Sequence, residues 1–212
     1  MGEALNGSLE AVCAPLRREF EERNAAREAA LSLSREIIRT SANTIRNIHR
    51  GEVEAANKLL AQAESLVRRM RGETGRFLDL SYPGYVHDAQ KEYTEAACTV
   101  ATLLGNPLPS PTDLGVESPA YLNGLGETVG ELRRYILDRI RAGDAAEAEA
   151  KLAIADEIHY ALTQFDYPEG VTGGLRRTAD AMRGILERTR GDVTTALCQH
   201  RLEVALSARE GA

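Results

Sequence analysis

The segment Tyr121–Leu132, which reads YLNGLGETVGEL, is the part of this 212-residue sequence that decides the fold. Just before it, Ser118-Pro119 supplies an N-cap residue followed by the proline that the first turn of a helix favours. Gly143 marks where this helix should end. Apolar side chains in between recur at steps of three and four residues, which is the period of an amphipathic helix: Leu122, Leu125, Val129, Leu132, Ile136 and Ile140.

Outward from this helix, the remainder of the chain also has helical character. Apolar positions at helical spacing predict further helices over residues 8–49, 52–70, 85–104, 144–165 and 173–209. We expect a kink or restart at Pro15 in the first and a break near Gly191-Asp192 in the last. Leu31, Ile38 and Ile45 repeat every seven residues, with Ser34, Ser41 and Ile48 offset by three. They suggest a heptad-like seam with small polar residues at some of its positions.

Glycine and proline clusters separate these helices at residues 72–84, 105–111 and 166–170. No segment alternates polar and apolar residues as a strand would. The prediction is an all-α chain forming a single domain over residues 1–212. Residues 1–7 and 210–212 are expected to be disordered.

The composition is that of a soluble globular protein, with 43% hydrophobic residues and 27% charged residues. Uncharged stretches fall short of the roughly 18 residues that a membrane-spanning helix needs, and the N-terminus lacks the pattern of a signal peptide. Cys13, Cys98 and Cys198 are widely spaced, which favours free thiols in a reducing cytoplasm. We therefore expect a cytoplasmic protein with no membrane partner.

Two pairs of glutamates carry the chemistry. Glu92 and Glu95 are three residues apart, and Glu127 and Glu131 are four apart, so each pair lies on one helix face. Four carboxylates from two helices can hold hard divalent cations, which promote phosphodiester hydrolysis. The same spacing also fits a solvated acidic surface opposite an apolar stripe. Three glycines within seven residues beside the second pair, which are unfavourable in a helix, indicate that something approaches that face closely: Gly124, Gly126 and Gly130.

At these residues the chain resembles the translin superfamily, and most of all its nuclease branch, translin-associated factor X (Trax), as a prokaryotic or archaeal homologue. Residues 33–50 resemble the first helix of that family, with its LSRDI and LHR patterns. Residues 90–96, QKEYTEA, resemble the factor X segment QEYVEA, and residues 121–132 resemble YLLGVADLTGEL. Gly143-Asp144 matches a recurring helix break, and the order of these blocks along the chain also fits.

The resemblance implies a protomer of about seven helices that assembles into a hollow, barrel-like octamer. Nothing in the sequence demands a second type of subunit, so we expect a homo-oligomer. It also implies an endoribonuclease that cleaves single-stranded RNA inside the barrel with Mg²⁺ or Mn²⁺. The acidic residues carry over to Glu92, Glu95, Glu127 and Glu131, as metal ligands and catalytic residues. Glu127 stands where the family more often has Asp, so its carboxylate reaches one methylene further.

Contacts to RNA are less well defined by the sequence. The net charge of −6 disfavours a protein that wraps nucleic acid over its whole exterior, but it matters less if RNA is enclosed and metals offset the carboxylates. His87 is the nearest remnant of the basic segment that translin uses. The densest basic cluster is a second candidate for phosphate contact, or else a solvated helix end: Arg68, Arg69, Arg71 and Arg76.

Two other classes of function compete. A non-catalytic translin-like protein that binds single-stranded RNA or DNA would share the fold. A di-iron or di-manganese carboxylate bundle would need two Glu-x-x-His pairs. The chain offers only Asp156-Glu157-Ile158-His159. The proposed nuclease, by contrast, requires no histidine as a general base.

Overall fold

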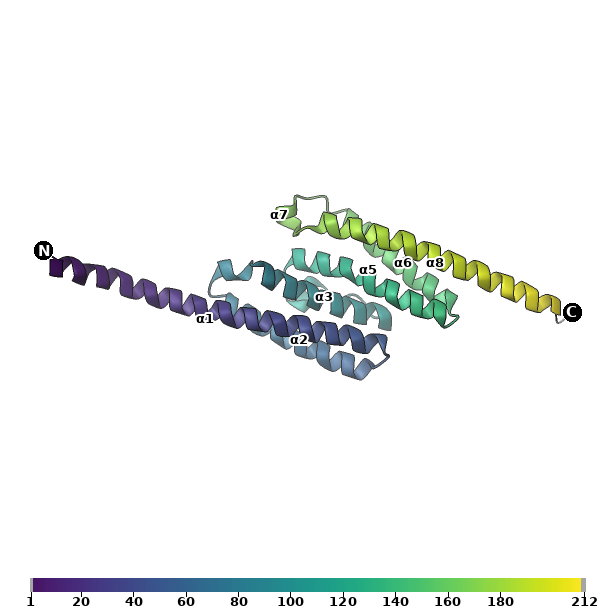
Figure 1. Cartoon of the computed structure of the whole chain (residues 1–212), viewed down its shortest axis with the longest axis horizontal. Helices are drawn as coiled ribbons and strands as arrows, with labels where there is room; N and C mark the ends of the chain where they lie inside the picture. The colour runs from purple at the N-terminus through teal and green to yellow at the C-terminus, as the bar shows by residue number, and fades with distance from the viewer. Residues whose placement is uncertain (1, 211–212) are drawn as a thin grey trace.

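The computed structural model describes residues 2–210 and places them in eight α-helices and one short 3₁₀ helix, with no strand among them (Figure 1). Six long helices form the body, close to the seven expected, and the all-α class is confirmed. The long helices are α1 (Gly2–His49), α2 (Val53–Thr74), α3 (Gly84–Leu104), α5 (Ser118–Arg141), α6 (Ala145–Thr163) and α8 (Leu175–Glu210). The short ones, in the connections, are η1 (Leu78–Ser81), α4 (Pro111–Leu114) and α7 (Glu169–Thr172).

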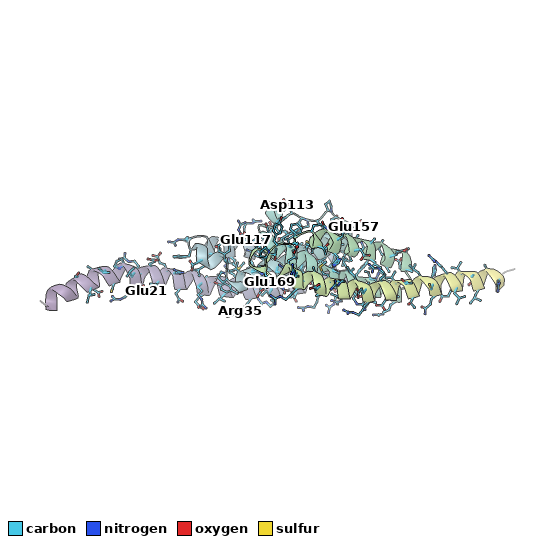
Figure 2. All side chains as sticks on the ribbon, turned by 90° about the horizontal axis from the view of Figure 1, so that it is seen from above. Glu21, Arg35, Asp113, Glu117, Glu157 and Glu169 are labelled. Carbon is cyan, nitrogen blue, oxygen red and sulfur yellow. The ribbon has the colours of Figure 1, made fainter. Side chains whose placement is uncertain are left out.

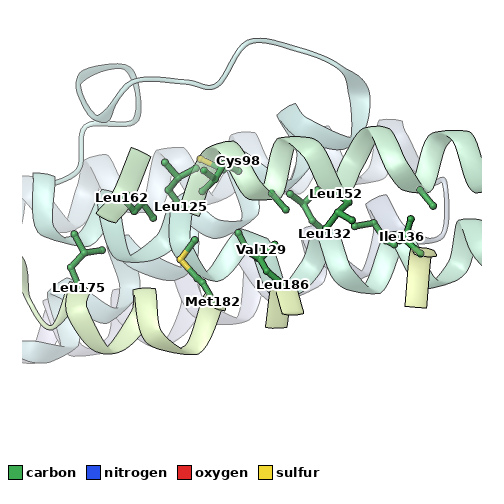
Figure 3. Packing of buried hydrophobic residues seen from close by; sticks show 14 residues of the cluster. Cys98, Leu125, Val129, Leu132, Ile136, Leu152, Leu162, Leu175, Met182 and Leu186 are labelled. Carbon is green, nitrogen blue, oxygen red and sulfur yellow. The ribbon is translucent and has the colours of Figure 1, made fainter. Parts of the chain in front are cut away.

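The body consists of two three-helix halves that meet along α3 and α5 (Figure 1). In the first half, α1, α2 and α3 enclose a core that includes Ile37, Met70 and Tyr93. In the second half, α5, α6 and α8 enclose the other core, shown in Figure 3, where Val129, Leu132, Ile136, Leu152, Leu162, Met182 and Leu186 interdigitate. The apolar stripe read from residues 122–140 therefore faces α6 and α8, and its opposite side is free to meet α3.

Helix ends follow local sequence signals only in part. Asp144 caps α6 as predicted, accepting a hydrogen bond from the Glu147 amide. Ser118 is not the N-cap of α5, because the helix already includes it and Glu117 occupies the cap position. The loop at residues 105–111 ends in the short helix α4, which Ser110 and Asp113 hold with a reciprocal capping box.

Several expectations for the two longest helices were wrong. Helix α1 runs through Pro15 without interruption, and α8 runs through Gly191, where nothing lies close to the position of a β-carbon. The seam on α1 agrees with the structure only in part. Its members Ser34, Ser41, Ile45 and Ile48 are buried. Leu31 and Ile38 are only half-buried, and Leu33 and Ile37 lie in the core instead. Proline is tolerated here because this part of α1 is exposed, where water can satisfy the carbonyl that proline leaves unpaired.

The ends of α1 and α8 extend beyond the body in opposite directions (Figure 1). Figure 2 shows Glu21 on the projecting part of α1. Both extensions carry large exposed apolar side chains: Leu9, Val12, Leu16 and Phe20 on α1, and Leu202, Val204 and Leu206 on α8. The disorder expected at residues 1–7 and 210–212 stays a prediction. In the described residues α1 begins at Gly2 and α8 ends at Glu210, and Met1 and residues 211–212 lie outside them.

None of the helices described over residues 2–210 combines the length and the apolar character needed to cross a bilayer. The three cysteines form no disulfide: Cys98 is buried in the second core, Cys13 is half-buried and Cys198 is exposed.

Candidate metal centre and the adjoining groove

Helices α3 and α5 bring three of the four predicted carboxylates together. Glu92 and Glu95 lie one turn apart on α3, and Glu127 faces them from α5. One carboxylate oxygen from each residue lies within 4.8 Å of the others, and all three side chains are half-buried. This set of oxygen donors matches the ligands that Mg²⁺ and Mn²⁺ prefer.

A glycine makes this convergence possible. A β-carbon at Gly124 would lie 2.5 Å from the carbonyl oxygen of Lys91 and 2.7 Å from Cβ of Thr94. The backbones of α3 and α5 therefore touch at this point, and Glu127, three residues further along α5, is carried against α3. Gly126 is likewise in tight contact, with α8, whereas nothing lies within 4 Å of a β-carbon at Gly130. The close approach expected at the glycine cluster thus holds for two of its three members.

The carboxylates are electrostatically strained. Burial, together with the charges of Glu127, Glu92 and Glu131, raises the pKa of Glu95 to about 8. Burial also raises the pKa of Glu92, where the charge of Lys91 opposes the shift and that of Glu127 adds to it. A cluster in which burial and mutual repulsion both disfavour ionisation is one that positive charge would stabilise.

The chain itself supplies one positive charge to this cluster. Lys91 Nζ donates to Oε1 of Glu127 at 2.7 Å and lies 4.0 Å from Oε1 of Glu92. Burial alone would lower the pKa of Lys91, but the hydrogen bond and charge of Glu127, with the charges of Glu92 and Asp88, raise it overall. The ammonium group therefore stays protonated and occupies the side of the cluster next to Glu127.

Glu131, the fourth predicted carboxylate, lies near Glu95 but has a partner of its own. His49, at the end of α1, is only 2% exposed, and its Nε2 lies 2.6 Å from Oε2 of Glu131. This hydrogen bond lowers the pKa of Glu131, outweighing the opposite effect of its burial. An ionised carboxylate can only accept, so Nε2 carries the proton that is donated. The buried Nδ1 of His49 has no hydrogen-bond partner among the described residues.

Beside the carboxylates lies an open groove of about 410 Å³. Glu95 and Glu127 form one side of it. Gly126, where α5 contacts α8, also lines it. The other side consists of residues of α8: Arg177, Thr178, Ala181, Met182 and Ile185. A volume of this size is within the range of small-molecule sites, about 300–1,000 Å³.

The remaining predicted contacts with RNA lie outside this groove. His87 is half-buried and lines a separate cavity of about 290 Å³ with Gln90 and Glu117. Arg68 is exposed on α2 and ion-paired with Glu64 of the same helix, and Arg69, Arg71 and Arg76 are also exposed. Roles for His87, Arg68 and Arg69 in RNA binding therefore stay predictions.

The residues of the alternative di-iron or di-manganese site lie outside the cluster of three glutamates. Asp156 makes an ion pair with Arg190 at 2.8 Å, and neither Asp156 nor His159 belongs to the cluster of possible ligands formed by Glu92, Glu95 and Glu127.

Three residues of the site were not identified from the sequence. His49 is 82 residues from its partner Glu131, and no local pattern links them. The sequence alone does not distinguish Arg177 from the other surface arginines, because its position in the groove depends on how α8 packs against α5. For Lys91 there was a signal, since it directly precedes Glu92, and a basic residue next to predicted metal ligands is a candidate to contact them.

Comparisons with other proteins place this chain in a family. No protein-family model matches the chain. An uncharacterised protein of Methanocaldococcus jannaschii, MJ0175, is 34% identical over 176 residues, which is 82% of this chain and 77% of that protein. Among solved structures, apo-NeC3PO superposes with a TM-score of 0.79 over 87% of this chain and 96% of its own, at 19% identity, which supports the fold alone.

A closer match is AfC3PO, an archaeal protein solved by crystallography and also as a complex with duplex RNA. It is 34% identical in the crystal structure and 33% in the RNA complex. The TM-score is 0.79 in both, and the match covers 88% of this chain and 97% of that one. With this identity over nearly the full length, and with the fold in common, the chain belongs to the family of the translin–Trax complex C3PO.

Proposed function

We propose that this protein is a metal-dependent endoribonuclease that hydrolyses RNA with Mg²⁺ or Mn²⁺ held by carboxylates of α3 and α5. One observation carries the proposal: Glu92, Glu95 and Glu127 converge within 4.8 Å at the junction of two helices, beside an open groove. The kinship with AfC3PO, which was solved in complex with duplex RNA, supports RNA as the ligand.

The proposed roles follow from the positions of the side chains. Glu92, Glu95 and Glu127 are the ligands of the ion, and Glu131, fixed by His49, adds negative charge next to Glu95. An ion bound there would lower the pKa of a coordinated water and offset charge on the leaving oxygen. Lys91 already holds Oε1 of Glu127, so an ion bound by this carboxylate would compete with the ammonium group for its negative charge.

The form of the RNA is a further part of the proposal. The resemblance to factor X favours single-stranded RNA, whereas the RNA in the AfC3PO complex is a duplex. A groove open to solvent excludes neither form on steric grounds. Cleavage of a labelled single strand is therefore to be compared with cleavage of the matching duplex.

We also propose that the protein works as a homo-oligomer, as a hollow barrel of eight copies. The support on the molecule is a row of exposed apolar side chains at helical spacing on the α1 extension, Leu9, Val12, Leu16 and Phe20, together with Leu202 and Leu206, which are exposed one turn apart on α8. Single exposed apolar residues are ordinary, but several along one projecting helix mark a surface that another chain covers. The mass in solution, measured by light scattering, tests this part.

A non-catalytic RNA-binding protein of the translin type is the second candidate. Lys91 favours it, because an internal ammonium group already neutralises part of the cluster without a metal. On this reading the protein binds RNA but does not cleave it when Mg²⁺ is added.

Substitution of a ligand separates the two candidates. Glu127→Gln keeps the size of the side chain but removes a charged metal ligand, so cleavage of RNA should be lost while RNA binding and oligomer mass remain. Glu157→Gln is the matched control, on an exposed position of α6 labelled in Figure 2. EDTA should stop cleavage reversibly. Full activity of Glu127→Gln, or wild-type binding without any metal-stimulated cleavage, would remove the nuclease proposal.

A further inference from the structure

The groove beside the carboxylates has two chemically different sides. On one side Glu95 and Glu127 are acidic and belong to the proposed metal centre. On the other side, α8 presents the cationic Arg177 near its start and an apolar surface about one to two turns later. The apolar part that is open to a ligand comprises Ala181 and Ile185, while Met182 beneath them is buried in the core.

Close packing fixes α8 at this place. A β-carbon at Gly126 would lie 2.5 Å from Cγ2 of Thr178 and 3.1 Å from Sδ of Met182. Thr178 also donates a hydrogen bond to Oδ1 of Asn123 at 2.7 Å. Since α5 carries both Asn123 and Glu127, these contacts hold the α8 side of the groove in a set position relative to the carboxylates.

Arg177 is available to a ligand. Its guanidinium is 81% exposed, and its ion pair is a 3.4 Å contact with Glu169, which is itself exposed. Exposed pairs of this kind contribute little free energy, about 0–1 kcal/mol. An anion with two or three oxygens can therefore replace Glu169 at Arg177, and phosphate is the anion for which a guanidinium has matching geometry.

We infer that the α8 side of the groove is a subsite for one nucleotide of RNA next to the cleaved bond. Arg177 binds a backbone phosphate, and the base and ribose of that nucleotide pack against Ala181 and Ile185. This inference rests on the proposed function and assigns to α8 a role in holding RNA that is separate from the ligands of the metal. It explains how a protein with a net charge of −6 attracts RNA towards an acidic site: a cation stands at the opposite edge of the same groove.

The neighbouring arginine offers a matched control. Arg176 is exposed like Arg177 and pairs with a single acidic residue, Asp166, at 2.9 Å, but it lies outside this groove. Arg177→Ala should weaken binding of a fluorescein-labelled RNA oligonucleotide roughly tenfold, the effect of one charge-assisted hydrogen bond pair, and reduce the salt dependence of binding by about one unit of slope. Arg176→Ala should leave both quantities at wild-type values.

A second variant tests the apolar part of the subsite. Ala181 is exposed on α8, so Ala181→Phe places a ring in the groove without disturbing the core. Ala150→Phe makes the same change on the exposed surface of α6. Ala181→Phe should weaken RNA binding and slow cleavage at least several-fold, with Mn²⁺ affinity measured by calorimetry unchanged.

The outcomes separate the subsite from the nuclease. If the wild-type protein binds Mn²⁺ and cleaves RNA, but Arg177→Ala and Ala181→Phe match their controls, the subsite is absent while the proposed function stands. If the wild-type protein binds neither Mn²⁺ nor RNA, the proposed function fails and the subsite fails with it. Loss of RNA affinity in both variants, with normal Mn²⁺ binding and normal thermal unfolding, supports the subsite.

Discussion

Lys91 Nζ lies 2.7 Å from Oε1 of Glu127, so an internal cation contacts one of the carboxylates proposed to bind metal. Lys91 and Glu127 belong to α3 and α5, the two helices that the site joins. The pair keeps the cluster partly neutral before an ion arrives. An ion bound by Glu127 would share this carboxylate with the ammonium group or displace it, so Lys91 opposes metal binding.

The first prediction concerns this competition. Lys91→Met removes the ammonium group but keeps a long side chain, so a divalent cation meets three carboxylates without a competitor. We expect Mn²⁺ to bind several-fold more tightly than in the wild type, measured by isothermal titration calorimetry. Lys58→Met, at an exposed position of α2, is the control and should not change the affinity. Weaker Mn²⁺ binding in Lys91→Met than in this control would contradict the competition.

The second prediction concerns pH and Glu95. Its pKa rises from an ordinary 4.5 to about 8 in the folded protein, so the folded state binds more protons than the unfolded state between these values. Without metal, stability should be greatest below pH 4.5 with respect to this group and should fall as pH rises towards 8. Glu95→Gln should remove this dependence and stabilise the metal-free protein at pH 8 by roughly 2–4 kcal/mol.

Urea unfolding in EDTA at pH 5 and pH 8 measures this effect for both proteins. Metal binding should show the opposite trend, because the ligand must be ionised: Mn²⁺ affinity of the wild type should increase up to about pH 8. Equal stability of wild type and Glu95→Gln at both pH values would mean that Glu95 is not electrostatically strained.

The third prediction concerns His49. His49→Ala leaves a buried cavity and removes the hydrogen bond to Glu131, at a cost of about 1–3 kcal/mol for the unpaired group alone. His49→Gln retains an amide N–H donor and should lose less stability. Thermal unfolding of the two variants measures the difference. If the alanine variant is as stable as the glutamine variant, the hydrogen bond to Glu131 contributes nothing.

The fourth prediction uses two glycines of the same helix. Gly124→Ala forces a β-carbon to within 2.5 Å of the Lys91 carbonyl oxygen, so α3 and α5 must separate, and we expect a loss of about 1–3 kcal/mol together with weaker Mn²⁺ binding. Gly130→Ala meets nothing within 4 Å and should gain up to about 1 kcal/mol from helix propensity. Chemical denaturation gives both values, and the same sign for both substitutions would contradict this packing.

Much of the fold could be predicted because helix periodicity is a local property. The stripe from Leu122 to Ile140 identified α5, and the spacing of Glu92 from Glu95 and of Glu127 from Glu131 placed each pair on one face. Prediction was less accurate on α1, where many small polar residues are buried, including Ser34, Ser41 and Thr44. A seam that mixes serine with isoleucine has no clear hydrophobic phase, so the core residues Leu33 and Ile37 were not assigned to it.

Contacts between side chains of different helices could not be predicted from local sequence patterns. The hydrogen bond from His49 to Glu131 depends on how α1 lies against α5, and the position of Arg177 depends on the contact of Thr178 with Gly126. Such contacts follow from the crossing of helices, which the sequence specifies only through the whole set of packed residues. The glycine cluster was the exception, since an unfavourable residue type in a helix signalled close packing before the partner was known.

The location of the carboxylates has a mechanical consequence. Glu92 and Glu95 belong to α3, in the first three-helix half, and Glu127 belongs to α5, in the second. An ion bound by all three would therefore cross-link the two halves. Removal of the ion by a chelator should then weaken the contact between the two halves. Each three-helix half would unfold more independently of the other. A metal ion bound where the two halves meet would make the rigidity of the protein depend on that ion.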